Sequence, residues 1–142
     1  MAVSLTTSWD TLHLSVVDES GAVVEEMDPS AIRNAVASTL SRLSAIPNES
    51  LVSLCMARGR EQLMAMISLF SRGTPFCCRG PTARPVSRWR VGNGLQPAET
   101  LETLDALPLD TAYTIYTSGS TGERKRVDVP RRCIAENIED FQ

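Results

Sequence analysis

The 142-residue sequence contains no long hydrophobic run, and it has little lysine and little histidine. No uninterrupted apolar stretch approaches the roughly 20 residues that a helix needs to cross a bilayer. Residues 1–10 lack the basic segment followed by an apolar one that marks a secretory signal. We therefore expect a cytoplasmic protein that makes no contact with a membrane.

The scarcity of histidine and of spaced cysteines argues against a metal site. The single histidine, His13, alternates with leucines, which places it on the exposed face of an expected strand. Cys77 and Cys78 are adjacent and so cannot form the spaced ligand pair of a zinc site. With Cys55 and Cys133, they lie in or beside apolar stretches. We expect buried, reduced thiols, no disulfides and no bound metal.

The net charge of −3 gives no reason to expect nucleic acid or an anionic membrane surface as a partner. Four arginines surround Trp89, at positions 79, 84, 88 and 90. They could form an RNA-binding surface or cation–π contacts, but a solvated polar loop is the preferred interpretation. Lys125 is the only lysine. Unless arginine-biased coding accounts for it, this position requires an explanation.

Length and composition fit one globular domain, because 42% of the residues are apolar and 22% are charged. Hydrophobic periodicity and turn residues predict the following elements in chain order: a strand over 12–18, a hairpin turn, a strand over 22–27, a helix from Asp28-Pro29, a strand over 51–56, a helix from about 60 to Gly73 and a strand over 74–78. The strand, helix and strand form a right-handed βαβ unit, so the pattern predicts an α/β fold. Prolines and glycines punctuate residues 79–109, which we expect to be mostly connection.

A strand, a loop and a second strand are predicted where the sequence has most chemical character, over residues 111–129. The loop at 118–122 contains two glycines and adjoins several hydroxyls, which suits the binding of an anion. Lys125 could reach the outer phosphates of a nucleotide. It follows Gly122 by three residues, whereas a Walker A lysine follows its glycine directly, so an ordinary ATPase or GTPase is a poor fit. From physics alone, a flexible hairpin loop with a solvated basic tip fits equally well.

Residues 112–127, Ala-Tyr-Thr-Ile-Tyr-Thr-Ser-Gly-Ser-Thr-Gly-Glu-Arg-Lys-Arg-Val, resemble the phosphate-loop signature of adenylate-forming enzymes, most of all the adenylation domains of nonribosomal peptide synthetases. Residues 69–76 resemble the helix end and strand that precede the loop in that family. The resemblance extends from about Asp28 to the end of the chain. It implies that the ATP phosphates are bound by Thr117, Ser118, Gly119, Ser120, Thr121, Gly122 and Lys125.

Two positions depart from the family pattern. The family usually has proline where Arg124 stands and glycine where Arg126 stands. If the glycine position requires a positive φ, Arg126 is strained by about 1 kcal/mol or more, and phosphate affinity is altered or lost. We also expect the connection between Pro81 and Leu109 to be too short for the additional strands and helix that the family places there.

The resemblance further implies that residues 1–142 form a single truncated amino-terminal subdomain, a partial large lobe of an adenylate-forming enzyme. The amino-acid pocket, the adenine and ribose contacts, the metal-binding acid and the mobile lid have no counterpart, so we expect no catalytic residues and no activity alone. Our first hypothesis is that the chain completes a truncated adenylation domain of a synthetase in trans, binding ATP and Mg²⁺ only in that complex. The alternatives are a non-catalytic module that docks on and stabilises a synthetase, and a remnant without a role.

Overall fold

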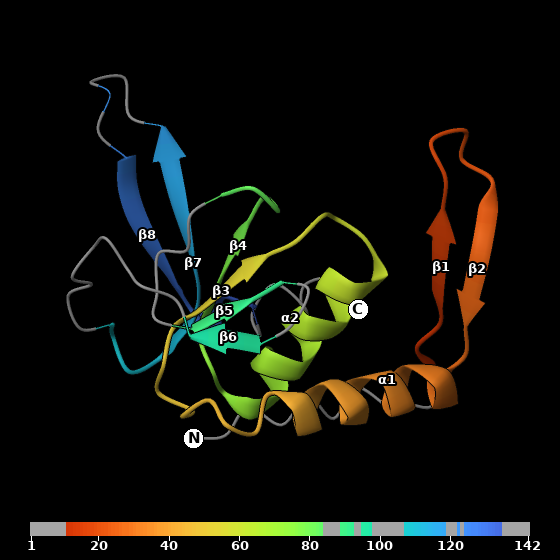
Figure 1. The fold of residues 1–142 in the computed structure, drawn as a ribbon, viewed down its shortest axis with the longest axis horizontal. Coiled ribbons are helices and arrows are strands. Elements are labelled where there is room, and N and C mark those ends of the chain that lie inside the picture. Colours follow the sequence, from red (N-terminus) through yellow and green to blue (C-terminus); the bar gives the residue numbers. More distant parts are fainter. Residues whose placement is uncertain are drawn as a thin grey trace.

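Two β-sheets and two helices make up the part of the chain that the computed structural model describes, which is residues 11–83, 89–92, 95–97, 107–118, 122 and 124–134 (Figure 1). In chain order the elements are β1 (Leu14–Val17), β2 (Val23–Met27), α1 (Pro29–Arg42), β3 (Val52–Cys55), α2 (Arg60–Arg72), β4 (Phe76–Arg79), β5 (Trp89–Val91), β6 (Leu95–Pro97), β7 (Thr111–Ser118) and β8 (Arg124–Pro130). The predicted α/β class, the amino-terminal hairpin and the strand-loop-strand order are confirmed. No helix among these residues is long and apolar enough to cross a membrane.

Strands β1 and β2 form an antiparallel hairpin that stands apart from the main sheet, at the end of α1 (Figure 1). The turn forms because the Asp18 carboxylate accepts hydrogen bonds from the backbone N–H groups of Ser20 and Ala22, at 2.8 and 3.0 Å. Gly21 completes the turn with a φ of 83°. Met27 at the end of β2 is buried against Ile32 of α1, which joins the hairpin to the rest of the protein.

Both helices begin or end where the sequence predicts. Asp28 caps α1, since its carboxylate accepts a hydrogen bond from the N–H of Ala31 at 2.8 Å, and Pro29 occupies the first turn. These contacts hold the pKa of the Asp28 carboxyl below its ordinary value, chiefly through the Ala31 N–H. Gly73 ends α2 in the left-handed conformation, with a φ of 80°.

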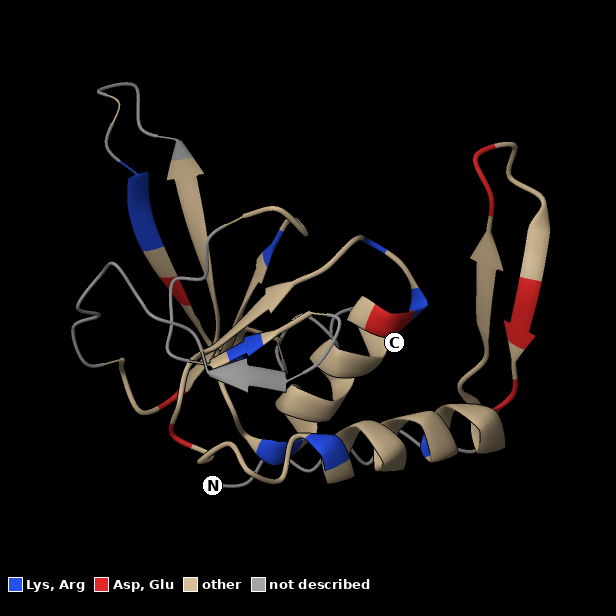
Figure 2. Cartoon of the chain, viewed as in Figure 1, with Lys and Arg blue, Asp and Glu red and all other residues tan. Residues whose placement is uncertain are grey.

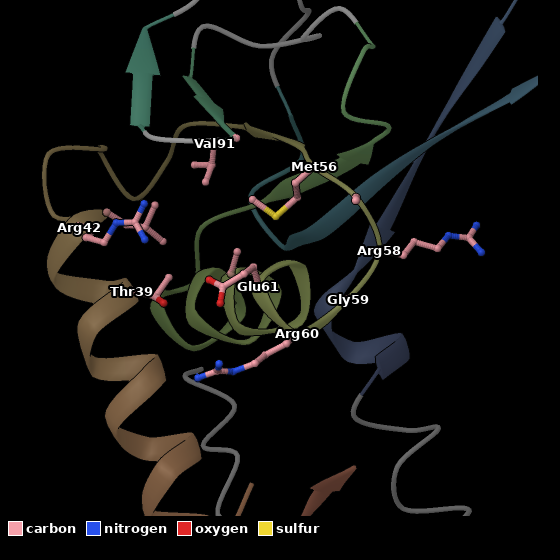
Figure 3. A pocket seen from close by; sticks show the side chains of 12 residues that line it. Thr39, Arg42, Met56, Arg58, Gly59, Arg60, Glu61 and Val91 are labelled. Atoms are coloured by element: carbon pink, nitrogen blue, oxygen red, sulfur yellow. The ribbon is translucent and has the colours of Figure 1, made fainter. Parts of the chain in front are cut away.

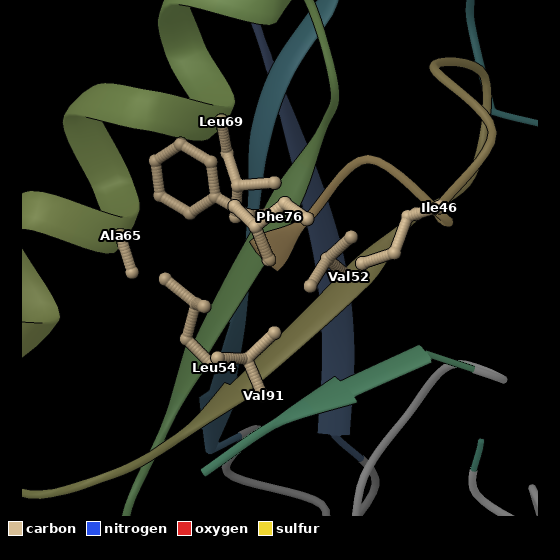
Figure 4. Packing of buried hydrophobic residues seen from close by; sticks show 8 residues of the cluster. Ile46, Val52, Leu54, Ala65, Leu69, Phe76 and Val91 are labelled. Atoms are coloured by element: carbon tan, nitrogen blue, oxygen red, sulfur yellow. The ribbon is translucent and has the colours of Figure 1, made fainter. Parts of the chain in front are cut away.

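The main sheet has six strands in the order β6-β5-β3-β4-β7-β8. Strands β3, β4, β5 and β7 are parallel, while β6 and β8 are antiparallel to their neighbours. One face of this sheet packs against α2, and the side chains that meet there form the main hydrophobic core (Figure 4). The core includes Val52, Leu54 and Phe76 from the strands and Ala65 and Leu69 from the helix. As predicted, β3 is buried on both faces.

Two predictions from the sequence are wrong, the solvated loop around Trp89 and the burial of Cys78. Residues 79–109, which the sequence predicts to be mostly connection, also contain the short strands β5 and β6, which extend the sheet beside β3. Trp89 packs against the core rather than lying in a solvated loop. Cys78 is exposed, since it lies toward the carboxyl end of β4 and outside the cluster that α2 covers. Cys55 and Cys77 are buried as expected, and Cys133 is half-buried.

Candidate functional site

The predicted phosphate loop lies at the tip of the hairpin that β7 and β8 form. β7 runs parallel to β4, and β8 pairs antiparallel with β7 along seven residue pairs. The last pairs before the loop are Thr117 with Lys125 and Ser118 with Arg124. The loop therefore follows the carboxyl end of β7, on the edge of the sheet where open α/β proteins bind their ligands.

The structure brings together two of the predicted phosphate-binding residues, Thr117 and Lys125. They are directly opposite each other in the ladder, and the Thr117 hydroxyl donates a hydrogen bond to the backbone carbonyl of Lys125 at 3.4 Å. Both side chains are exposed. A residue with a hydroxyl and a residue with an ammonium group thus face each other at the base of the loop, and both groups are of the kind that binds phosphate oxygens.

Gly122 is the described residue of the loop that requires glycine. Its φ is +82°, a conformation that residues with a Cβ adopt only with strain, and a Cβ at this position would meet no atom within 4 Å. Ser118 is described by its backbone pairing alone, and Gly119, Ser120 and Thr121 lie outside the described residues. Their predicted role in phosphate binding stays a prediction.

Arg126 is accommodated in β8 without backbone strain. It lies opposite Tyr116 in the ladder, and no residue other than glycine has a positive φ in the described part of the chain. Its Nε atom lies 3.1 Å from Oδ1 of Asp128, two residues along the same strand. The strain considered for an arginine at this position is therefore absent from the fold.

The base of the loop is positively charged. Arg124 and Lys125 are exposed and Arg126 is half-buried, and these three consecutive residues begin β8 (Figure 2). Asp128 neutralises Arg126 through their ion pair, which leaves Arg124 and Lys125 as the exposed cations closest to the loop among the described residues. Exposed cations at this place favour an anionic ligand.

Contacts that the sequence did not reveal hold the hairpin against the rest of the sheet. The Tyr113 ring stacks on Phe76 with centroids 5.9 Å apart, and the Arg79 guanidinium lies 5.6 Å from the centre of the Tyr116 ring. Arg131, which follows β8, donates a hydrogen bond to the carbonyl of Phe70 at 2.9 Å and lies 4.7 Å over its ring. Arg131 thereby joins the end of the hairpin to the last turn of α2.

A separate cavity of about 460 Å³ lies at the carboxyl ends of β3 and β5 (Figure 3). Thr39 and Arg42 of α1, Glu61 of α2 and Val91 of β5 line it. Arg58 extends away from its centre, and Arg60 forms an ion pair with Glu25 at 3.2 Å. None of the residues that line the cavity belongs to the β7–β8 hairpin, so the cavity is not part of the predicted phosphate site.

The thiols near the sheet have no features of nucleophiles or metal ligands. Burial raises the pKa of Cys77, which keeps this thiol protonated at neutral pH. Desolvation likewise raises the pKa of Cys78. No group of three or more histidine, cysteine or acidic side chains comes together within the described ranges in a way that could bind a metal ion.

Comparison with known proteins links the chain to enzymes that form adenylates. No family model matches the sequence. The chain is 51% identical over 50 residues to malpibaldin synthetase of Mortierella alpina, a match that covers 35% of this chain and 1% of that protein. It is also 46% identical over 39 residues to nonribosomal peptide synthetase 13 of Aspergillus fumigatus, covering 28% of this chain and 2% of that protein. The chain thus spans a small fraction of the curated relatives that it matches.

Solved structures share the fold at low sequence identity. The amino-terminal subdomain of Klebsiella oxytoca NpsA superposes with a TM-score of 0.60 and 16% identity, over 78% of this chain and 37% of that one. O-succinylbenzoate coenzyme A synthetase of Bacillus subtilis, solved in complex with AMP, gives a TM-score of 0.57 and 16% identity, over 78% and 38% of the two chains. The mixed α/β sheet described above corresponds to part of the amino-terminal domain of these proteins.

Proposed function

Since the chain is homologous to the amino-terminal region of the adenylation domains of nonribosomal peptide synthetases, we propose that it supplies the phosphate-binding hairpin for ATP-dependent amino-acid activation by a synthetase. The observation that carries this proposal is the geometry at the base of the loop. Thr117 and Lys125 are paired directly across the hairpin, and Gly122 adopts the left-handed conformation between them. A hydroxyl, a cation and a turn in the backbone are the groups that a phosphate-binding loop needs.

In the proposed reaction, a carboxylate oxygen of the amino acid attacks the α-phosphorus of ATP. A new bond forms between that oxygen and phosphorus, the bond from the α-phosphorus to the bridging oxygen breaks, and pyrophosphate leaves with the negative charge. The ammonium of Lys125 would offset the charge on the leaving phosphates. Thr117, Ser118, Gly119, Ser120, Thr121 and Gly122 would hold the phosphate oxygens of ATP together with its Mg²⁺.

We place the rest of the active site on a second chain, an adenylation domain of a synthetase that lacks the corresponding part. The described residues support such an arrangement because they form a hydrophobic core of their own, in which Val52, Leu54 and Leu69 are fully buried. A piece with its own core can fold first and associate afterwards. The amino acid would then be selected by the second chain.

A second candidate function is that of a binding module that docks on a synthetase and stabilises it without contacting nucleotide. Arg124 and Arg126 favour this candidate, since they replace the proline and glycine that the family usually has there. Arg126 is also committed to an ion pair with Asp128 at 3.1 Å, which draws its charge away from the loop. The two candidates differ in whether Lys125 contributes to the reaction rate.

Replacement of Lys125 separates these candidates. The experiment measures amino-acid-dependent pyrophosphate exchange by the co-purified complex of this chain with such a synthetase. We expect Lys125→Ala to slow exchange by roughly ten- to a hundredfold, because charge-assisted contacts of this kind contribute about 1.5–3 kcal/mol. Lys125→Arg should recover part of the rate because it keeps the charge.

The control is Arg58→Ala, which removes an exposed cation from the segment between β3 and α2, outside the phosphate hairpin (Figure 3). It should leave both assembly and exchange unchanged. Equal rates for Lys125→Ala and Arg58→Ala, with the complex intact in both, would favour the binding module over the phosphate-binding function.

A further inference from the structure

The outer edge of β8 is free in the part of the chain that the structure describes. β8 is the last strand of the six-stranded sheet and pairs only with β7. It is seven residues long, so its outer side presents several backbone N–H and C=O groups that have no strand partner. A free edge of this length is a template for another strand.

An apolar pair lies exposed next to this edge. Ile115 of β7 and Val127 of β8 are opposite each other in the ladder, with exposed fractions of 45% and 42%. They lie on the same face of the sheet as Tyr113, which is two residues before Ile115 and packs against the core. The core that α2 covers therefore ends before it reaches this pair, and the apolar surface continues to the edge.

We propose that a second copy of this chain pairs its own β8 antiparallel to this edge, with Val127 on the two-fold axis. The sequence of the strand, Arg-Lys-Arg-Val-Asp-Val-Pro from residue 124 to residue 130, fits this register. With Val127 facing Val127 of the second copy, Arg126 faces Asp128 of the second copy, and the reverse pair follows by symmetry. A two-fold contact requires such a self-complementary strand.

Both faces of the joined sheet would then carry favourable pairs. On the face that carries α2, the two Val127 side chains would meet, and with the Ile115 side chain beside each of them they would form an apolar row across four strands. On the other face, each Arg126 would lie between two carboxylates, its own Asp128 at 3.1 Å and that of the second copy. The antiparallel arrangement also places the Arg124 and Lys125 of one copy beside the far end of the other strand, which keeps the two basic segments apart.

Pairing at this edge leaves the phosphate loop accessible. The loop lies beyond residue 124, at the end of the hairpin, so the two loops of a dimer would lie at opposite ends of the joined strands. The dimer is consequently independent of nucleotide binding. It can fail while the proposed function holds, and the reverse is also true.

Sedimentation velocity on the full chain tests the pairing. We expect a species with the mass of two 15.5 kDa chains that grows with protein concentration. Val127→Lys should weaken association at least about tenfold, because the substituted residue meets its own copy and sets two ammonium groups opposite each other. The matched control is Val24→Lys, which replaces a valine that is 62% exposed in the separate hairpin and should leave association unchanged.

Cysteine cross-linking tests the register. Opposed residues in an antiparallel ladder have Cβ atoms about 4.5–5.5 Å apart, close enough for a disulfide after a small adjustment. In a Cys78→Ser background, which removes the exposed native thiol, Val127→Cys should form a covalent dimer under mild oxidation and Val24→Cys should not. Exchange of the charges in the double variant Arg126→Asp with Asp128→Arg should preserve the dimer, whereas Asp128→Arg alone should weaken it.

A chain that stays monomeric at every concentration, or a dimer that Val127→Lys leaves intact, would overturn the proposal. If the chain is monomeric and Val127→Lys instead abolishes binding to a synthetase, the edge is occupied by a strand of the synthetase and self-pairing is wrong. The pyrophosphate-exchange experiment with Lys125→Ala tests the role of the phosphate loop separately from dimer formation. Failure of the dimer is thus distinguishable from failure of the proposed function.

Discussion

Gly122 carries the conformational requirement of the phosphate hairpin, and position 126 does not. Gly122 has a φ of +82°, whereas Arg126 continues a regular strand opposite Tyr116. An arginine at 126 can therefore replace the usual glycine without a backbone penalty, and it gains an ion pair with Asp128. At the residue scale, the departure changes the charge around the loop and leaves the path of the backbone intact.

Substitution of Gly122 by alanine should destabilise the chain by about 1 kcal/mol, because an L-residue adopts the left-handed conformation only with strain. There is open space around the position, so steric clash contributes nothing. The measurement is the free energy of unfolding from urea titration, followed by circular dichroism.

The matched control for this substitution is Gly80→Ala. A Cβ at Gly80 also meets no atom within 4 Å, but its φ lies outside the positive range. This change should be neutral or stabilising by about 0.4–1 kcal/mol, through the reduced entropy of the unfolded chain. Equal effects at the two glycines would contradict the left-handed turn at 122.

At the scale of elements, two arginines connect the last turn of α2 to its neighbours: Arg72, which ends α2, and Arg131, which follows β8. Arg72 reaches back to the segment after α1, where it donates to the carbonyl of Ile46 at 2.6 Å and to the side-chain oxygen of Asn48 at 3.0 Å, as well as to the carbonyl of Leu43. Arg131 binds the same end of α2 from the hairpin side, through the carbonyl of Phe70. Burial lowers the pKa of Arg131, yet its charge persists at any physiological pH. The last turn of α2 thus connects α1 to the phosphate hairpin.

Replacement of Arg72 by methionine should cost about 1.5–3 kcal/mol of unfolding free energy, because two carbonyls and an amide oxygen lose a charged donor. Methionine keeps the apolar length of the side chain, so the loss is mainly of hydrogen bonds. Arg72→Lys should recover only part of the stability, since a lysine cannot donate to three acceptors with the planar geometry of a guanidinium. Chemical unfolding of the three proteins measures this, and equal stability would show that the contacts contribute nothing.

Local signals were sufficient to predict the elements up to β4 and the hairpin of β7 and β8. A few residues of sequence are enough to predict the Asp28-Pro29 cap, the left-handed Gly73 and the aromatic strand β7. The three-residue strands β5 and β6 have no such signal, because a strand that short shows no measurable alternation. They are strands because β5 pairs with β3 and β6 pairs with β5. The contacts of Arg72 and Arg131 were equally hidden, since they join positions 24 to 61 residues apart.

The candidate site was predictable to the extent that it depends on local sequence. The motif identified the hairpin and the pairing region of Thr117 and Lys125, because loop, glycine and lysine follow one another along the chain. The exposed pair of Ile115 and Val127 was not predictable, since their burial depends on where α2 stops covering the sheet. The edge position of β8 depends in the same way on the order of all six strands.

For the whole molecule, we expect that the purified chain catalyses no amino-acid-dependent pyrophosphate exchange and that activity arises on addition of a synthetase chain lacking the equivalent region. The reason is that, among the described residues, the predicted phosphate-binding groups lie at the β7–β8 hairpin, whereas the separate cavity at β3 and β5 is lined by none of them. Mixing the two chains should restore exchange in proportion to the amount of complex formed. The Val127→Lys variant, if monomeric, then shows whether self-association of this chain competes with formation of that complex. Exchange by the purified chain alone would contradict the division of the active site between two chains. A stable complex without exchange would leave this chain as a docking module whose hairpin contacts protein instead of ATP.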